Sequence, residues 1–128
     1  MLLDTSVLID LQREVASGRS GPACAWLEAR SAQPLSVSVV TVGEFAEGFA
    51  DVESRLLRDL LSGFEVVPID HSVALVYARL SRQMRADNRR IGDNDIWIAA
   101  TAIAYGLPLV TRDARRMGRI AGLSIVTY

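Results

Sequence analysis

The chain has 128 residues, of which half are hydrophobic and 23% are charged, a balance typical of one globular domain. Its formal net charge of −1 argues against broad nucleic-acid binding through a basic surface. All 14 basic residues are arginine, which excludes every mechanism that needs a catalytic or phosphate-binding lysine. The single cysteine, Cys24, excludes an intrachain disulfide. It lies in an apolar helical pattern, so we expect a small core residue rather than a nucleophile.

Neither a targeting signal nor a membrane segment is expected. The first apolar residues are followed at once by Asp4, and no basic region precedes them. The longest uncharged run covers 96–111, but Gly106 and Pro108 interrupt it, and it is too short to cross a bilayer. We therefore expect a cytoplasmic protein.

The first half of the chain predicts two strands and four helices. Leu2 and Leu3 begin a strand that ends at Asp4, and Thr5 and Ser6 are suited to cap the helix that follows. The other elements expected in this half are helices at 23–30, 41–50 and 55–61 and a strand at 35–38.

The second half predicts three more strands and three helices. Asp70 is suited to cap a long helix whose apolar residues recur at helical spacing, and Gly106 ends the next helix. The elements expected are strands at 65–69, 107–111 and 123–126 and helices at 71–88, 95–105 and 113–120. Strands that alternate with helices throughout predict an α/β fold, with a mainly parallel five-stranded sheet between helices, in one domain over 1–128.

Four acidic residues fall where a parallel sheet places its ligand site. Asp4 ends the first strand, and Asp113 lies two residues beyond the fourth. Glu44 lies early in the helix after the second strand, and Asp95 starts the helix that leads to the fourth. Carboxylates gathered at one edge repel each other unless a cation joins them. Mg²⁺ or Mn²⁺ is the expected cofactor, since both prefer carboxylate oxygens and no Cys/His cluster favours zinc.

Each acid also has a purely structural interpretation. Thr41 and Glu44 match a capping box, and Asp95 is placed to favour the dipole of its helix. Asp113 could cap the helix after it. Asp4 is the hardest to explain in this way, because a charge at the end of a buried apolar strand needs a partner. Together, the matching strand-end positions favour a functional site.

Four segments resemble the motif blocks of PIN-domain nucleases and, more narrowly, of the small VapC-type toxins of toxin–antitoxin modules. The segments are Leu2–Ile9, Thr41–Phe45, Asp95–Ala100 and Leu109–Asp113. The resemblance implies a three-layer α/β/α sandwich and RNA cleavage that depends on Mg²⁺ or Mn²⁺. It also implies homodimerisation, inhibition by a small cognate antitoxin, and toxin–antitoxin assembly. The acidic pocket it implies is formed by Asp4, Glu44, Asp95 and Asp113.

Two details depart from the simplest family pattern. The fourth acidic position is often Asn in the family, whereas here it is Asp113. The helix start carries two acids, Asp93 and Asp95, and the apolar run 98–100 follows Asp95 at the family's distance. The resemblance therefore assigns the role of ligand to Asp95. Asp93 is expected as a cap or an outer group, and as a second candidate for the metal.

The expected chemistry is hydrolysis of a phosphodiester by a metal-activated water. Asp4 and Asp95 are expected to hold the ion, with Glu44 and Asp113 bound directly or through water. The resemblance implies products with 5′-phosphate and 3′-hydroxyl ends. Candidates for water or substrate contacts are Thr5, Ser6, Thr111 and Arg112, and the three hydroxyl residues could equally serve as caps or strand ends.

Three other function classes are alternatives to a PIN-domain nuclease. A receiver domain has similar length and acids but needs a lysine after a late strand. A haloacid-dehalogenase-type phosphatase needs that lysine too, and an aspartate where this chain has Ser6. A PIN-like module that binds RNA or a protein without cutting is the remaining alternative, and the complete set of acids argues against it.

Overall fold

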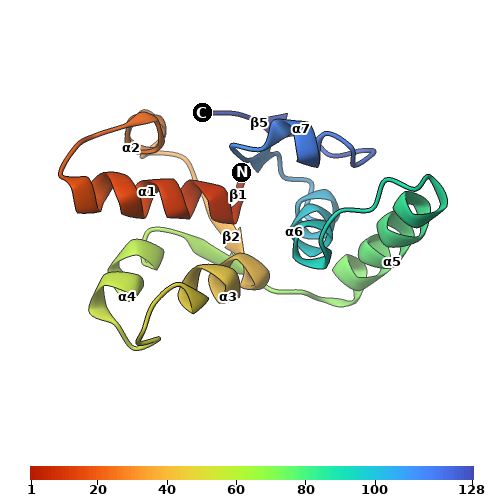
Figure 1. Cartoon of the computed structure of the whole chain (residues 1–128), viewed down its shortest axis with the longest axis horizontal. Helices are drawn as coiled ribbons and strands as arrows, with labels where there is room; N and C mark the ends of the chain where they lie inside the picture. Colours follow the sequence, from red (N-terminus) through yellow and green to blue (C-terminus); the bar gives the residue numbers. More distant parts are fainter.

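The computed structural model describes all residues, 1–128, and is built around a five-stranded sheet in which every pair of neighbours is parallel. The strand order is β3-β2-β1-β4-β5. Figure 1 shows β1 and β2 at the centre of the molecule and β5 near the C-terminus. The strands are β1 Leu2–Leu3, β2 Ser36–Ser38, β3 Glu65–Val67, β4 Leu109–Val110 and β5 Ile125–Val126. The predicted α/β class and the predicted count of strands are confirmed.

The two faces of the sheet build separate cores, because successive side chains of a strand point to opposite faces. Leu2 belongs to one buried cluster and Leu3 to the other. The neighbouring strand repeats this division, with Leu109 on the side of Leu2 and Val110 on the side of Leu3. Fully buried strands of this kind need helices on both faces.

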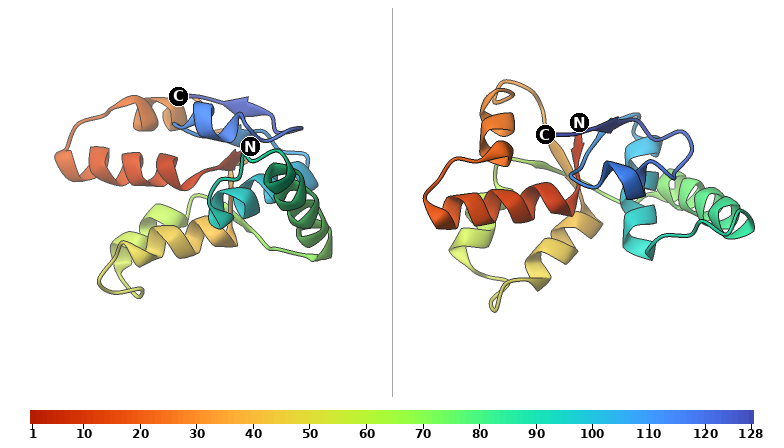
Figure 2. Two further views of the ribbon diagram at one scale, coloured as in Figure 1. Left: turned by 45° about the vertical axis from the view of Figure 1, so that its right-hand side comes forward. Right: turned by 45° about the horizontal axis from the view of Figure 1, so that its top comes forward.

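Helices cover each face and complete a three-layer α/β/α sandwich. The helices on the Leu3 side are α1 Thr5–Ser17, α2 Pro22–Glu28, α3 Val39–Glu47 and α4 Arg55–Leu61. Those on the Leu2 side are α5 His71–Ala86, α6 Asp93–Ala104 and the short α7 Ala114–Met117. Both views of Figure 2 keep α5 and α6 on the side of the molecule opposite α1, α3 and α4. None of these helices has the length and apolar character needed to cross a membrane.

Several elements are shorter than the sequence predicts. Strand β3 stops before Pro68 and β4 begins after Pro108, and proline cannot donate a backbone hydrogen bond to a neighbouring strand. Thr111 lies beyond the assigned end of β4, but its N–H still donates to the carbonyl oxygen of Val126 at 3.0 Å. The helix expected at 113–120 is a single turn, α7. These elements therefore differ from the prediction only in the residues at which they begin and end.

The topology places a crevice between β1 and β4. The chain runs from β1 outward to β3 on one side, then returns to build β4 and β5 on the other. Strand order reverses at this pair, and ligands of open parallel sheets bind beyond the carboxyl ends at such a point. The backbone N–H of Asp4 donates to the Val110 carbonyl oxygen at 2.9 Å, so Asp4 and the end of β4 lie side by side.

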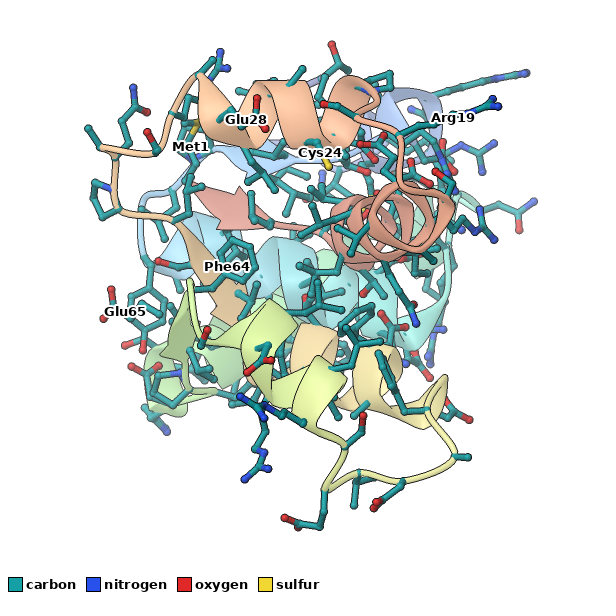
Figure 3. All side chains as sticks on the ribbon, turned by 90° about the vertical axis from the view of Figure 1, so that its left-hand side faces the viewer. Met1, Arg19, Cys24, Glu28, Phe64 and Glu65 are labelled. Carbon is teal, nitrogen blue, oxygen red and sulfur yellow. The ribbon has the colours of Figure 1, made fainter.

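Cys24 is not in the core, contrary to the sequence prediction. It is a free thiol of intermediate exposure and points from α2 toward α1 (Figure 3). Its helix is short, and its first turn lies beside Glu14, whose carboxylate accepts the Cys24 backbone N–H at 2.8 Å. Burial, together with the Glu14 carboxylate, raises the pKa of the Cys24 thiol, which favours the unreactive protonated form.

Candidate metal centre

A pocket of about 630 Å³ opens at the carboxyl edge of the sheet, where the topology predicts a site. Five carboxylates and two guanidinium groups line it. The lining residues are Asp4, Thr5, Ser6, Ile9, Glu44, Glu47, Gly92, Asp93, Asn94, Asp95, Arg112 and Arg116. Such a surplus of negative charge in one cavity favours binding of a cation.

Asp4 is the most deeply buried of these acids, with 2% of its surface exposed. It is the N-cap of α1, and its Oδ1 accepts the backbone N–H of Thr5 at 2.8 Å. Its Oδ2 accepts the hydroxyls of Ser6 and Thr111 at 2.9 and 2.7 Å. No arginine pairs with it. A buried carboxylate that has only neutral donors attracts a cation strongly.

Glu44 is fixed in the pocket by contacts from two other segments. Helix α3 is capped by Ser38, whose Oγ accepts the Thr41 N–H at 2.9 Å, so the capping-box interpretation of Glu44 is wrong. The Glu44 Oε2 accepts the hydroxyl of Thr5, and its Oε1 accepts the side-chain amide of Asn94 at 3.0 Å. Glu44 therefore connects α3 to the starts of α1 and α6.

Asp95 lies in the first turn of α6, with 15% of its side chain exposed. The pKa of its carboxyl group lies above the usual value for aspartate. Burial is the largest cause, the Arg116 guanidinium opposes it, and the charges of nearby carboxylates add to it. Those carboxylates are Asp4, Glu44 and Asp113. The charges of the other three predicted acids therefore act on Asp95.

Asp93 lines the same pocket but is held toward its outer side. Helix α6 starts at Asp93 behind the N-cap Gly92, so the expectation that Asp93 is a cap is wrong. Its Oδ1 accepts hydrogen bonds from Arg90 and, at 3.2 Å, from the Tyr77 hydroxyl. The hydrogen bond from Arg90 lowers the pKa of Asp93, whose side chain is 61% exposed.

Asp113 is not among the residues that line the pocket, although Arg116, which does line it, pairs with Asp113. It is the N-cap of α7, as its structural interpretation predicted, and its Oδ1 accepts the Arg116 N–H at 3.0 Å. Its Oδ2 lies 3.2 Å from the Arg116 Nε. The same Nε lies 3.3 Å from the Asp95 Oδ2, so one guanidinium joins Asp113 to Asp95.

The predicted hydroxyl residues Ser6 and Thr111 contact Asp4, and Arg112 contacts Ser6 through its backbone. The Ser6 Oγ accepts the Arg112 backbone N–H at 3.2 Å, and the Thr111 Oγ1 accepts the Asp113 N–H at 3.0 Å. Thr5 does not cap α1, because Asp4 does. The Arg112 guanidinium pairs with Asp10, which does not line the pocket.

Three polar side chains of the pocket, those of Glu47, Asn94 and Arg116, are not among the site residues predicted from the sequence. Glu47 lies three residues after Glu44, and this spacing places both on one side of a helix. Asn94 directly precedes Asp95, so its proximity was readable, although its contact with Glu44 was not. Arg116 follows Asp113 by three residues, and only the folded chain brings it to Asp95.

The donor set fits a hard divalent ion. Every candidate ligand is a carboxylate, and oxygen ligands of this kind suit Mg²⁺ and Mn²⁺. As the side chains stand, no three acidic, histidine or cysteine groups converge on one point that could hold an ion. Arg116 accounts for part of this spacing, because it lies between Asp95 and Asp113.

Comparisons with known proteins identify the family of the chain. The family model for the PIN domain matches residues 1–123. The VapC ribonuclease Y4jK of Sinorhizobium fredii is 31% identical over 98% of this chain and 95% of its own length. Ribonuclease VapC10 of Mycobacterium tuberculosis is 37% identical over 87% of this chain and 80% of its own.

A solved structure has the same fold. The DNA-bound VapBC of Salmonella typhimurium superposes with a TM-score of 0.84 at 23% identity, over 98% of this chain and 96% of that one. The fold, the match to the family model and the identity with these relatives lead to one conclusion. This chain belongs to the PIN-domain family and, within it, to the VapC ribonucleases, which are a metal-dependent family.

Proposed function

We propose that this chain is an endoribonuclease that hydrolyses RNA phosphodiester bonds with a metal-activated water, and that it is the toxin of a VapBC-type toxin–antitoxin module. The observation that carries this proposal is the buried Asp4 carboxylate, which has three neutral donors and no cationic partner. Glu44 and Asp95 line the same pocket.

Asp4 and Asp95 would hold the ion, Mg²⁺ or Mn²⁺, with Glu44 and Asp113 bound directly or through water. A bound ion would lower the pKa of a coordinated water and offset negative charge on the phosphate oxygens. Asp93 is a weaker candidate for a ligand, because Arg90 and Tyr77 both donate to its Oδ1.

Hydroxyl and amide donors orient the carboxylates before any ion binds. Ser6 and Thr111 hold Asp4, while Thr5 and Asn94 hold Glu44. Groups that fix metal ligands in this way contribute to both affinity and rate. The hydroxyls of Thr5 and Ser6 line the pocket and are therefore also available to a water or a phosphate oxygen.

RNA would be bound at this pocket through arginine. Arg112 lines the pocket with a half-exposed side chain, and its guanidinium can present two parallel N–H donors to a phosphate. Asp10 holds this guanidinium near the pocket, so the arginine loses less freedom when it binds RNA.

Cleavage of RNA by the purified chain tests the enzymatic part of the proposal. We expect cleavage with Mg²⁺ or Mn²⁺, none with excess chelator, and a loss of about 100-fold or more in Asp4→Asn. Asp59→Asn is the matched control, since Asp59 is an exposed residue of α4 that pairs only with Arg55. Asp4→Asn cleaving at the wild-type rate would contradict the proposal. Metal-independent RNA binding without cleavage would favour the non-cutting module instead.

Expression in bacteria tests the biological part of the proposal, which includes a small cognate antitoxin and a homodimer. The antitoxin is supported by the similarity of this chain to VapBC-5 of Mycobacterium tuberculosis, a member of the VapBC family of toxin–antitoxin systems. Expression of the chain alone is expected to arrest growth, and co-expression of the small protein encoded beside it is expected to restore growth. Normal growth with abundant folded, active enzyme would contradict the role of toxin.

A further inference from the structure

One cation of this chain already lies among the proposed metal ligands. The Nε of Arg116 is 3.3 Å from the Asp95 Oδ2 and 3.2 Å from the Asp113 Oδ2. Arg116 is the only basic residue within ion-pair distance of any of the four predicted acids.

We propose that Arg116 is an internal counter-ion of the metal-free site, and that a divalent ion must displace it to bind Asp95 and Asp113. This inference rests on the proposed metal centre. It assigns to Arg116 the role of lowering the affinity of the site for its own cofactor.

The hydrogen bonds of Asp113 show how the displacement would work. Its Oδ1 accepts the Arg116 backbone N–H, whereas its Oδ2 faces the side chain of the same residue. Movement of the guanidinium therefore frees Oδ2 and leaves the cap of α7 intact. The same movement frees the Asp95 Oδ2. One rotamer change thus exposes two ligand oxygens on two different acids.

Exposure limits the size of the effect. The Arg116 side chain is 46% exposed, so water can solvate the guanidinium once it leaves the carboxylates. Ion pairs of this kind are weak, and displacing them does not block an ion that binds several carboxylates. We expect competition and not exclusion, with a change in metal affinity of about three- to tenfold.

Arg115 provides a matched control. It lies beside Arg116 on α7, is also exposed, and forms no ion pair. Arg115→Gln and Arg116→Gln remove the same charge from the same helix. Any difference between them therefore reports the contacts with Asp95 and Asp113 and not the net charge.

Calorimetric titration of Mn²⁺ into the full chain tests the inference without using activity. We expect Arg116→Gln to bind Mn²⁺ about three- to tenfold more tightly than wild type. Arg115→Gln should stay close to wild type, as should Arg116→Lys, which keeps the charge near both acids. Unfolding curves of the metal-free variants check that each one is folded.

Each outcome has a distinct meaning. Equal Mn²⁺ affinities for wild type, Arg116→Gln and Arg115→Gln would overturn the role of Arg116 and leave the metal centre standing. Equal tightening in both glutamine variants would also overturn it, since net charge would then be the cause. Absence of Mn²⁺ binding by wild type would overturn the metal centre and this inference with it.

Discussion

Asp4 serves the fold and the proposed chemistry at once. One of its oxygens accepts the first free N–H of α1, and the other accepts two hydroxyls. A charged cap exposed to water would stabilise a helix by a modest amount. Asp4 is buried instead, without a cation, and this arrangement is costly unless the site gains an ion.

Substitution of Thr111 should change the orientation of the Asp4 carboxylate and leave its charge in place. The Thr111 hydroxyl donates to Asp4 and accepts from the Asp113 N–H, and the side chain is completely buried. We expect Thr111→Val to lower metal affinity or cleavage rate about 10- to 100-fold, because Asp4 loses a donor that orients it. Stability should fall by about 1–3 kcal/mol, since the Asp113 N–H is left unpaired.

Thr111→Ser keeps the hydroxyl and is the control for this change. Cleavage rates over a range of metal concentrations and urea unfolding of the metal-free proteins are the two measurements. If Thr111→Val has the cleavage rate and the metal affinity of wild type, the hydroxyl has no part in orienting Asp4.

The ionised Asp95 carboxylate should lower the free energy of unfolding of the metal-free protein. Burial raises the pKa of Asp95, and the neighbouring acids add to this effect against the opposing charge of Arg116. We expect Asp95→Asn to abolish cleavage and to raise the free energy of unfolding at pH 7 by about 1 kcal/mol.

The pH dependence of this difference has a definite sign. The pKa of Asp95 is higher in the folded chain than in the unfolded chain, so the folded state binds its proton more tightly. The difference in the free energy of unfolding between Asp95→Asn and wild type should therefore shrink as the pH falls from neutral toward about 4. Urea unfolding at both pH values measures it, and a variant less stable than wild type at pH 7 would refute the prediction.

At the scale of elements, the acids lie where helices begin. Asp4 caps α1, Asp95 lies in the first turn of α6, and both helices direct their N-terminal ends at the pocket. The partial positive charge of a helix N-terminus favours ionised carboxylates nearby. The fold thus places two of the proposed ligands at helix N-termini, although at Asp95 burial and the neighbouring acids outweigh this effect and raise the pKa.

Glu14 performs a purely structural task in the same layer. Its carboxylate accepts the backbone N–H groups of Gly21, Ala23 and Cys24 at 3.1, 3.0 and 2.8 Å, which ties the start of α2 to α1. Burial alone would raise the pKa of Glu14, but these donors together outweigh it and the pKa lies below its usual value.

The stability that this contact provides should depend on pH. It is present above the usual glutamate pKa of about 4.3 and is lost as the pH falls through the lower folded value. Glu14→Gln should therefore be less stable than wild type at pH 7, with a difference that shrinks in acid. Thermal unfolding at pH 7 and pH 3 measures it. A difference in stability that grows in acid would contradict the structural role of the Glu14 carboxylate. The rate of RNA cleavage by Glu14→Gln should equal that of wild type.

At the scale of the whole molecule, the alternation of strands and helices was enough to predict the sheet and its carboxyl edge. The position of Asp4 followed from the same pattern, because it ends the first strand. The start of α6 was misplaced by two residues. The hydrogen bond from the Ile96 N–H to the Gly92 carbonyl oxygen sets this start. The order of the polar residues 93–95 does not predict that bond.

Contacts between distant side chains could not be predicted. Arg116 reaches Asp95, and Asn94 reaches Glu44, only after the sheet has placed their helices together. Many other arginines had an equal claim from sequence, since all 14 basic residues are of that type. The ligand types were therefore readable from the sequence, whereas the partners that hold or compete for them were not.

The most direct test of the metal centre is the location of Mn²⁺ in crystals of the full chain, measured by anomalous scattering. The account predicts a peak inside the pocket, in contact with the carboxylates of Asp4 and Asp95, and an Arg116 side chain that has moved away from Asp95. A peak elsewhere, or none in crystals saturated with Mn²⁺, would contradict it.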